Sequence, residues 1–194
     1  MKKKKIPVNL LGAAGNLLIR EPWQTIMGSG EEELLRRIAE GDEWALERLY
    51  TDYHPRLARF ILRVTRDVDL AREIINDVFM VIWRSAGRFR GDSSVSTWIL
   101  GIAYRKALKS SGRYRPAPAP LGGADSAEVE QHSRRLDIDS SLARLSREQR
   151  ATVELAYYFG YSYREIAEIM RCPENTVKTR MFHARRALRS LLET

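Results

Sequence analysis

Cysteine is almost absent from this chain, and so are the patterns of catalytic residues. Of 194 residues only Cys172 is a cysteine, so neither an internal disulfide nor a cysteine-rich zinc site can form. There are three histidines, no nucleophile, base and orienting-acid pattern, and no glycine-rich phosphate loop. We therefore expect a protein of a reducing compartment, the cytoplasm, that is not an enzyme and has no metal, cofactor or small-molecule substrate.

Long apolar runs are also lacking, because no window approaches the roughly 18 apolar residues of a membrane-spanning helix. The N-terminal "MKKKKIPVNLLGAAGNLL" begins like a signal peptide, with lysines before an apolar run. Asn9, Gly12, Gly15 and Asn16 dilute that run, and no small-residue cleavage site follows. We expect residues 1–30 to be a mobile basic extension, with Met27 as an alternative start.

The sequence also lacks the alternation of apolar and polar residues that is typical of strands, and its apolar residues have helical spacing instead. Apolar spacing predicts helices over about 31–40, 44–65, 69–86 and 96–111, with Pro55 kinking or splitting the second and Ser96 capping the fourth. The stretch "RPAPAPLGGADS" offers nothing to bury and predicts a flexible linker. The expected fold class is all-α: two small helical domains, 31–113 and 138–194, joined by a linker over 114–137.

Basic residues are in excess, with a net charge of +8 and a pI near 9.8, which favours a polyanionic partner. In "SYREIAEIM", Ser162 and Glu165 have the spacing of a capping box, and Pro173 predicts a break before a helix starting at 173–176. From Asn175 to Leu192 that helix has five Lys or Arg and no acid. Two helices joined by a tight turn, the second polar and basic, predict a DNA-binding helix-turn-helix.

Helical spacing places Val177, Met181, Ala184 and Leu188 on the packing face of this last helix. We expect the DNA contacts to come from its other residues: Thr176, Lys178, Thr179, Arg180, Phe182, His183 and Arg186. The alternative is a solvated basic face on an ordinary helical bundle.

A second basic stretch runs from Arg84 to Arg115, with eight Lys or Arg, one acid and four interleaved aromatic residues. Basic grooves with aromatic surfaces suit unpaired bases, because stacking accepts any base. Trp98 has the spacing of a core residue. Phe89 and the serine-rich loop over 92–96 are therefore the better candidates for holding an extruded base.

Four stretches, in this order, carry a family resemblance: "LAREIINDVFMVIW", "FRGDSSVSTWILGIAYRKA", "LSREQRATVELAYYFGYSYREIAEIM" and "CPENTVKTRMFHARRALRSLL". The chain resembles a bacterial extracytoplasmic-function (ECF) sigma factor over about 31–115 and 140–193. It departs from the family pattern at Asn76-Asp77, usually Gln-Glu, and at Asn175-Thr176, usually Gly-Thr. The second departure leaves the fold unaffected but is expected to alter sequence preference.

The resemblance implies a role for each region. Region four would read the minus-35 element through the 173–192 helix. Region two would bind core RNA polymerase through Asn76, Asp77, Met80 and Arg84. It would also capture the melted minus-10 strand, with contacts from Phe89, Arg90, Ser93, Ser94, Ser96, Arg105, Lys109 and Arg113.

The implied partners are core RNA polymerase, promoter DNA in duplex and single-stranded form, and an anti-sigma factor. The isolated chain should not open a promoter, because unstacking costs roughly 1.4 kcal/mol per base-pair step and stacking on a protein aromatic returns about 1–3 kcal/mol per base. The alternative is a free-standing dimeric helix-turn-helix regulator. Such a protein would protect palindromic sites without polymerase.

Overall fold

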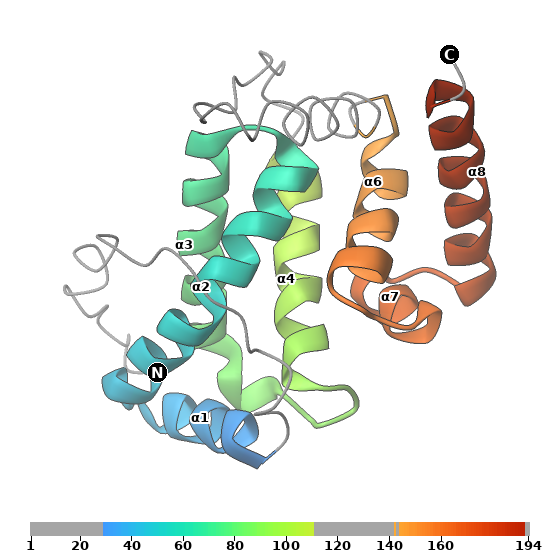
Figure 1. Cartoon of the computed structure of the whole chain (residues 1–194). Coiled ribbons are helices and arrows are strands. Elements are labelled where there is room, and N and C mark those ends of the chain that lie inside the picture. The colour runs from blue at the N-terminus through green and yellow to red at the C-terminus, as the bar shows by residue number, and fades with distance from the viewer. Residues whose placement is uncertain (1–28, 111–141, 143, 193–194) are drawn as a thin grey trace, which may run out of the picture.

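The computed structural model describes residues 29–110, 142 and 144–192, and within these it contains helices and no strand (Figure 1). The all-α prediction is confirmed. The predicted linker over 114–137 lies outside the described residues, as do residues 1–28 of the predicted extension. None of the described helices is long and apolar enough to cross a membrane.

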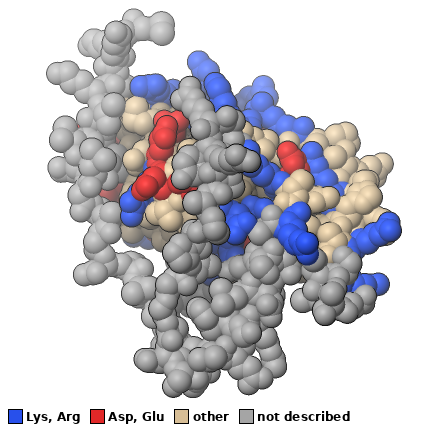
Figure 2. Space-filling model, turned by 90° about the horizontal axis from the view of Figure 1, so that it is seen from above, with Lys and Arg blue, Asp and Glu red and all other residues tan. Residues whose placement is uncertain are grey.

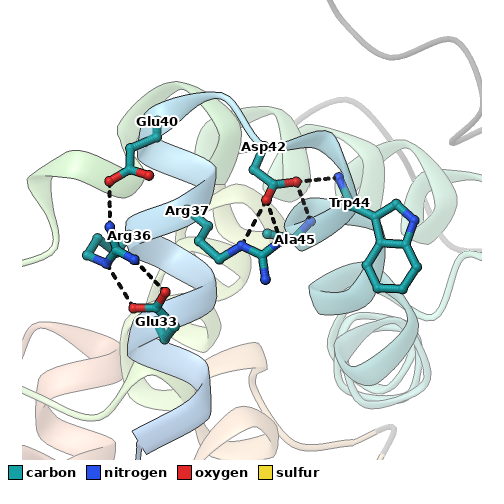
Figure 3. Close-up of polar contacts among 7 residues, drawn as sticks. All are labelled: Glu33, Arg36, Arg37, Glu40, Asp42, Trp44 and Ala45. Carbon is teal, nitrogen blue, oxygen red and sulfur yellow. Dashed lines mark hydrogen bonds and ion pairs between the residues drawn. The ribbon is translucent and has the colours of Figure 1, made fainter.

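The first helix, α1 (Ser29–Glu40), meets the second, α2 (Glu43–Thr65), at a corner set by Asp42. The Asp42 carboxylate caps α2 by accepting from the amides of Trp44 at 2.9 Å and Ala45 at 3.1 Å, and it also accepts from Arg37 Nε at 2.8 Å (Figure 3). The two amides and the Arg37 guanidinium hold the pKa of Asp42 below its usual range. Gly41, with φ of 97°, supplies the left-handed turn that ends α1.

Helix α2 continues through Pro55, so the predicted split at this proline is wrong. Pro55 lies on the exposed side of the helix. The cost of a proline inside a helix is about 3 kcal/mol. Tyr53, Leu57 and Phe60 are buried on the opposite side, and each contributes about 1.5–3 kcal/mol by leaving water. Burial on both sides of the proline therefore keeps the helix whole.

Helix α3 (Val68–Ser85) is capped by Asp67 and runs into a 3-10 turn, η2 (Ala86–Arg88). A loop then leads to α4 (Val95–Ser110). The predicted cap of α4, Ser96, is wrong by two residues: Ser94 Oγ accepts from the Thr97 amide at 3.2 Å, whereas Ser96 lies inside the first turn and is 3% exposed. Helices α2, α3 and α4 pack together, and α1 crosses one end of them against η2 (Figure 1).

The second unit contains α6 (Arg147–Val153), a π-helical turn η3 (Glu154–Tyr158), α7 (Tyr163–Met170) and α8 (Glu174–Leu192). Ser146 and Gln149 form a capping box at the start of α6. Between α6 and α8 lies a small separate core made of Leu145, Val153, Met181 and Ala184.

The two units pack against each other, α4 on α7 and α2 on α6. Their apolar residues form one continuous core, in which Ile166 and Ile169 of α7 join residues such as Ile99 and Ala103 of α4. The sequence predicts two helical units, and the structure adds that they share a buried interface.

Candidate nucleic-acid interface

The turn between α7 and α8 has the predicted local chemistry. Ser162 Oγ accepts from the Glu165 amide at 3.3 Å, and Glu165 Oε2 accepts from the Ser162 amide at 2.8 Å, so the predicted capping box is confirmed. Arg171 ends α7 in the left-handed conformation, with φ of 49°. Helix α8 begins at Glu174, directly after Pro173 and within the predicted range. The second helix therefore leaves the first at a sharp, fixed turn.

Helix α8 has one buried face and one exposed face. Val177, Met181 and Ala184 are at most 1% exposed. On the opposite face Thr176 is half-buried. Five other predicted DNA contacts on this face are exposed: Lys178, Thr179, Phe182, His183 and Arg186. Phe182 is 62% exposed and meets the His183 ring edge-on, with centroids 5.5 Å apart. This face is free to enter a groove.

The cations of the exposed face are held weakly. Lys178 Nζ lies 2.9 Å from the Glu174 carboxylate, but both side chains are about half exposed, and such pairs contribute little to stability. A phosphate can therefore compete for Lys178. Beside this face, Thr176, Thr179 and His183 line an open depression of about 420 Å³ between α8 and the start of α6.

Arg180 stands apart from the other predicted contacts on α8. Its side chain is half-buried, and Nη1 lies 3.5 Å from Cys172 Sγ and 3.9 Å from Met170 Sδ. In this position the guanidinium braces the turn between α7 and α8. On a helical wheel, Arg180 lies closer to Val177 than to Phe182. Helical spacing alone therefore predicts that Arg180 is less exposed than the other predicted contacts.

Arg185 was missed by the sequence reasoning. Its Nε donates to Tyr157 Oη at 2.8 Å, and its guanidinium carbon lies 5.6 Å from the centre of the Tyr157 ring. Tyr157 is 63% exposed, so the pair forms a basic, aromatic edge next to the exposed face of α8. Because Tyr157 is 28 residues away in the sequence, only the fold reveals this pair.

In the first unit, the loop after η2 presents part of the predicted minus-10 set. Arg90 is exposed and pairs with Asp92 at 3.1 Å, while Phe89 is half-buried with its ring 5.6 Å from that of Trp98. Ser94 is exposed and Ser93 half-buried. Ser96 is not part of this surface. Its hydroxyl lies 3.1 Å from Ser94 Oγ and points into the protein.

The basic end of α4 is unevenly exposed. Lys109 is exposed, whereas Arg105 is half-buried, and burial together with the nearby Arg171 charge lowers its pKa. Arg113 lies outside the described residues. Figure 2 shows Lys and Arg spread over most of the described part of the face in view, with the acidic side chains in small patches.

The predicted polymerase contacts form one stripe on α3. Asn76, Met80 and Arg84 are four residues apart, and none of the three is buried. Asp77, beside them, accepts from Lys106 Nζ of α4 at 2.7 Å. This bond ties the stripe to α4. Among the described residues, no group of three or more His, Cys, Asp or Glu is placed to hold a metal ion.

Two family models match the chain, one on each unit. The model "Sigma-70 region 2" matches residues 49–115, and the model "Sigma-70, region 4" matches residues 135–188. Helix α1 precedes the first match. The second match includes the α7–α8 turn and almost all of α8.

Curated relatives match over nearly their whole length. The ECF RNA polymerase sigma factor SigK of Mycobacterium tuberculosis is 30% identical over 181 residues, covering 86% of this chain and 96% of SigK. The RNA polymerase sigma-H factor of Pseudomonas aeruginosa is 29% identical over 182 residues, covering 84% of this chain and 94% of that protein.

Two solved structures share the fold. CnrH, solved in complex with the cytosolic domain of CnrY, has a TM-score of 0.67 at 19% identity and covers 85% of this chain and 98% of its own. The sigma factor RpoE from Bartonella quintana, solved with the anti-sigma factor NepR, has a TM-score of 0.55 at 24% identity. The match covers 76% of this chain and 96% of RpoE. Because both helical units and nearly the full length of SigK are matched, this chain belongs to the extracytoplasmic-function family of RNA polymerase sigma factors.

Proposed function

We propose that this protein is an alternative sigma factor that binds core RNA polymerase and brings it to promoters with two separate elements. The observation that carries the proposal is the pair of surfaces, one on each unit. The exposed face of α8 follows a fixed turn, and the loop from Phe89 to Ser94, with Arg90 exposed, precedes α4. The role of the protein in transcription is initiation, and no catalytic step is assigned to it.

Region 4 would read the minus-35 element in the duplex. Lys178, Phe182 and Arg186 lie on the exposed side of α8 with Thr179 and His183. Each good bidentate base contact supplies roughly 1–3 kcal/mol of discrimination, so this face specifies a short element and not a long operator. Arg185, held by Tyr157, would contact a phosphate next to the groove.

Region 2 would hold the melted minus-10 strand and the polymerase. Phe89, Arg90 and Ser94 would meet an unpaired base, and Lys109 would follow the backbone. The α3 stripe of Asn76, Met80 and Arg84 would bind core polymerase. Captured bases return about as much energy as their unstacking costs, so polymerase must supply the energy for opening the rest of the bubble.

We also expect an anti-sigma partner and a cytoplasmic location. Of the two similar structures, CnrH was solved with the cytosolic domain of CnrY, and RpoE was solved with the anti-sigma factor NepR. A dimeric helix-turn-helix regulator is the weaker candidate, because it leaves the loop from Phe89 to Ser94 and the α3 stripe without a role.

The test is run-off transcription from fragmented genomic DNA by core RNA polymerase, with and without the chain. New start sites that share two spaced upstream elements are expected. Replacing Lys178 and Arg186 by alanine should weaken use of the upstream element. The control is Arg36→Ala, which removes two exposed ion pairs on α1. No new start sites, together with palindromic protection by the chain alone, would establish the dimeric regulator instead.

A further inference from the structure

Arg185 of α8 is held by a neutral partner. Its Nε donates to Tyr157 Oη at 2.8 Å, and its guanidinium carbon lies 5.6 Å from the centre of the Tyr157 ring. Several other exposed arginines pair with carboxylates instead, namely Arg36, Arg48, Arg72, Arg90 and Arg164. A carboxylate neutralises the charge of a guanidinium, whereas a phenol orients the guanidinium and leaves its charge intact. Arg185 is therefore both oriented and fully charged.

The bond to Tyr157 leaves most of the Arg185 donors available. A guanidinium has five N–H donors, and Tyr157 accepts from the one on Nε. Within the part of the chain that the structure describes, no carboxylate is bonded to Arg185. Arg185 is exposed, and Tyr157 is 63% exposed. The donors on the two terminal nitrogens match the spacing of two phosphate oxygens.

Arg185 shares one edge of α8 with two other cations. At 3.6 residues per turn, Lys178, Arg185 and Arg189 lie within about 40° of one another around the helix and span about 16 Å along it. All three are exposed, and no acid follows Glu174 on α8. We call these three residues the basic edge. It borders the face of α8 that is expected to enter the groove, where the backbone of a bound duplex would lie.

The opposite flank of α8 has different chemistry. Thr179 and His183 line the depression of about 420 Å³ there, together with one carboxylate, Glu148, and one guanidinium, Arg180. The formal charges of Glu148 and Arg180 cancel, whereas the charges of the basic edge add. Electrostatic attraction to a phosphate is therefore concentrated on one flank of the helix.

The Tyr157–Arg185 pair lies entirely within the second unit, since Tyr157 belongs to η3 and Arg185 to α8. The next residue, Tyr158, contacts a different helix: the Arg59 guanidinium of α2 lies 4.0 Å from the centre of its ring. Two adjacent exposed tyrosines thus contact arginines of different helices. Of the two, only Tyr157 orients a cation of α8.

We propose that Tyr157 is a positioning residue that orients Arg185 toward a backbone phosphate of duplex DNA, beside the groove that α8 enters. The proposal rests on the proposed function and deepens it, because it assigns to region 4 a contact with one strand that does not depend on base sequence. Arg185 supplies the charge and the donors. Tyr157 orders the side chain before DNA arrives, so less conformational entropy is lost on binding.

The experiment measures binding of a fluorescent promoter duplex to the complex of core RNA polymerase and the full chain, over a series of salt concentrations. The duplex comes from a promoter found by the run-off experiment. Arg185→Ala should weaken binding about tenfold, because a hydrogen bond to a charged group is lost. The slope of the logarithm of the binding constant against the logarithm of salt concentration should fall by about 1. Discrimination against single-base changes in the minus-35 element should change less than twofold, because phosphate contacts carry no sequence information.

Tyr157→Phe tests the positioning role, because it keeps the ring and removes the acceptor of the Arg185 bond. Binding should weaken about threefold, and the salt slope should stay unchanged. The matched control is Tyr158→Phe, which keeps the ring that contacts Arg59 and removes a hydroxyl without a bond to any described residue. Arg36→Ala on α1 is the control for loss of one exposed charge. Both control chains should bind like the unmodified one.

A double-mutant cycle separates positioning from a structural role. In an Arg185→Ala chain, Tyr157→Phe should cause no further loss of binding. A further threefold loss in that background would overturn the positioning role, because Tyr157 would then act without Arg185.

Uncharged methylphosphonates, placed one at a time along both strands of the minus-35 region, locate the contact. One position should weaken binding of the unmodified chain about tenfold and leave binding of the Arg185→Ala chain unchanged. If no phosphate position depends on Arg185, the proposal is wrong.

Folding and the proposed function are checked separately. Circular dichroism should show unchanged helix content for each variant, and Arg185→Gln, which keeps part of the side-chain stem, repeats the test if Arg185→Ala unfolds. If the unmodified chain forms no promoter complex with core polymerase, the proposed function itself is wrong. If that complex forms and loss of the Arg185 charge leaves the salt slope unchanged, only the phosphate contact is wrong.

Discussion

The two helical units differ in how they are stabilised. Region 2 has a core built by its own four helices, with fully buried residues on each of them, among them Leu35, Leu57, Ile82 and Ile99. Region 4 has a separate core of four residues, and its other buried residues, such as Leu155 and Ile166, join the core of region 2. Region 4 therefore depends on its neighbour for part of its burial.

The largest expected effect comes from a residue that serves both units. Phe60 of α2 is fully buried and meets Phe159 of region 4. Phe60→Ala should lower the free energy of unfolding by about 3–5 kcal/mol, because it removes a large core side chain and leaves a cavity. Urea denaturation followed by circular dichroism measures it. Trp44→Ala, at a site 73% exposed, is the control, and a loss below about 1 kcal/mol for Phe60→Ala would contradict the shared core.

A second substitution tests whether region 4 can unfold locally while region 2 stays folded. Met181 is 1% exposed and packs with Leu145 and Val153. Met181→Ala should cost about 2–5 kcal/mol, and the loss should be local to region 4. Hydrogen exchange with mass spectrometry should show faster exchange in α8 peptides and unchanged protection in α3 peptides. Equal loss of protection in both units would mean that they unfold as one.

The helix caps allow a matched comparison of the two units. Ser94 Oγ accepts from the Thr97 amide in region 2, and Ser162 Oγ accepts from the Glu165 amide in region 4. Ser94→Ala and Ser162→Ala should each cost about 1 kcal/mol, because each leaves a helix N-terminus without its side-chain acceptor. Thermal unfolding measures both. Ser93→Ala, which removes a hydroxyl with a 3.5 Å contact only, should be nearly neutral.

The smallest effect is a pH dependence confined to region 2. Burial lowers the pKa of His54, which packs on the Tyr50 ring at 5.0 Å. The unfolded chain then binds a proton more readily than the folded chain, so stability should fall as the pH drops below about 6.5. His54→Gln should flatten this part of the stability profile. A His54→Gln chain that still loses stability below about pH 6.5 as steeply as the unmodified chain would contradict the assignment.

Local features of the fold were predictable from the sequence. The Ser162–Glu165 capping box, the break at Pro173 and the buried face through Val177 and Met181 follow from neighbouring residues alone. Both helical units and the exposed residues of α8 follow from the same periodicity. These features need no information about the rest of the chain.

The remaining features depend on contacts between distant residues. Ser96 is an acceptable cap by composition, but Tyr161 holds it inside, and Ser94 takes the cap. Pro55 stays within a helix because residues on both sides of it are buried. The Arg180 guanidinium contacts the sulfur atoms of Met170 and Cys172, and Arg185 donates a hydrogen bond to Tyr157. The packing of α7 on α4 is likewise invisible to periodicity, because it depends on which surfaces meet.

Gly101 has a consequence for how such a chain can evolve. A glycine inside a helix costs about 1 kcal/mol relative to alanine, and Gly101 lies where α4 packs on α7. An alanine Cβ would be in ordinary contact with the Ile169 backbone, at 3.6 and 3.8 Å, and 3.1 Å from Arg105 Nη1, which must shift slightly, whereas a longer side chain would force the helices apart. The position touches neither the exposed face of α8 nor the α3 stripe. A change in a single codon can therefore alter how tightly the two units pack without changing the exposed residues of α8.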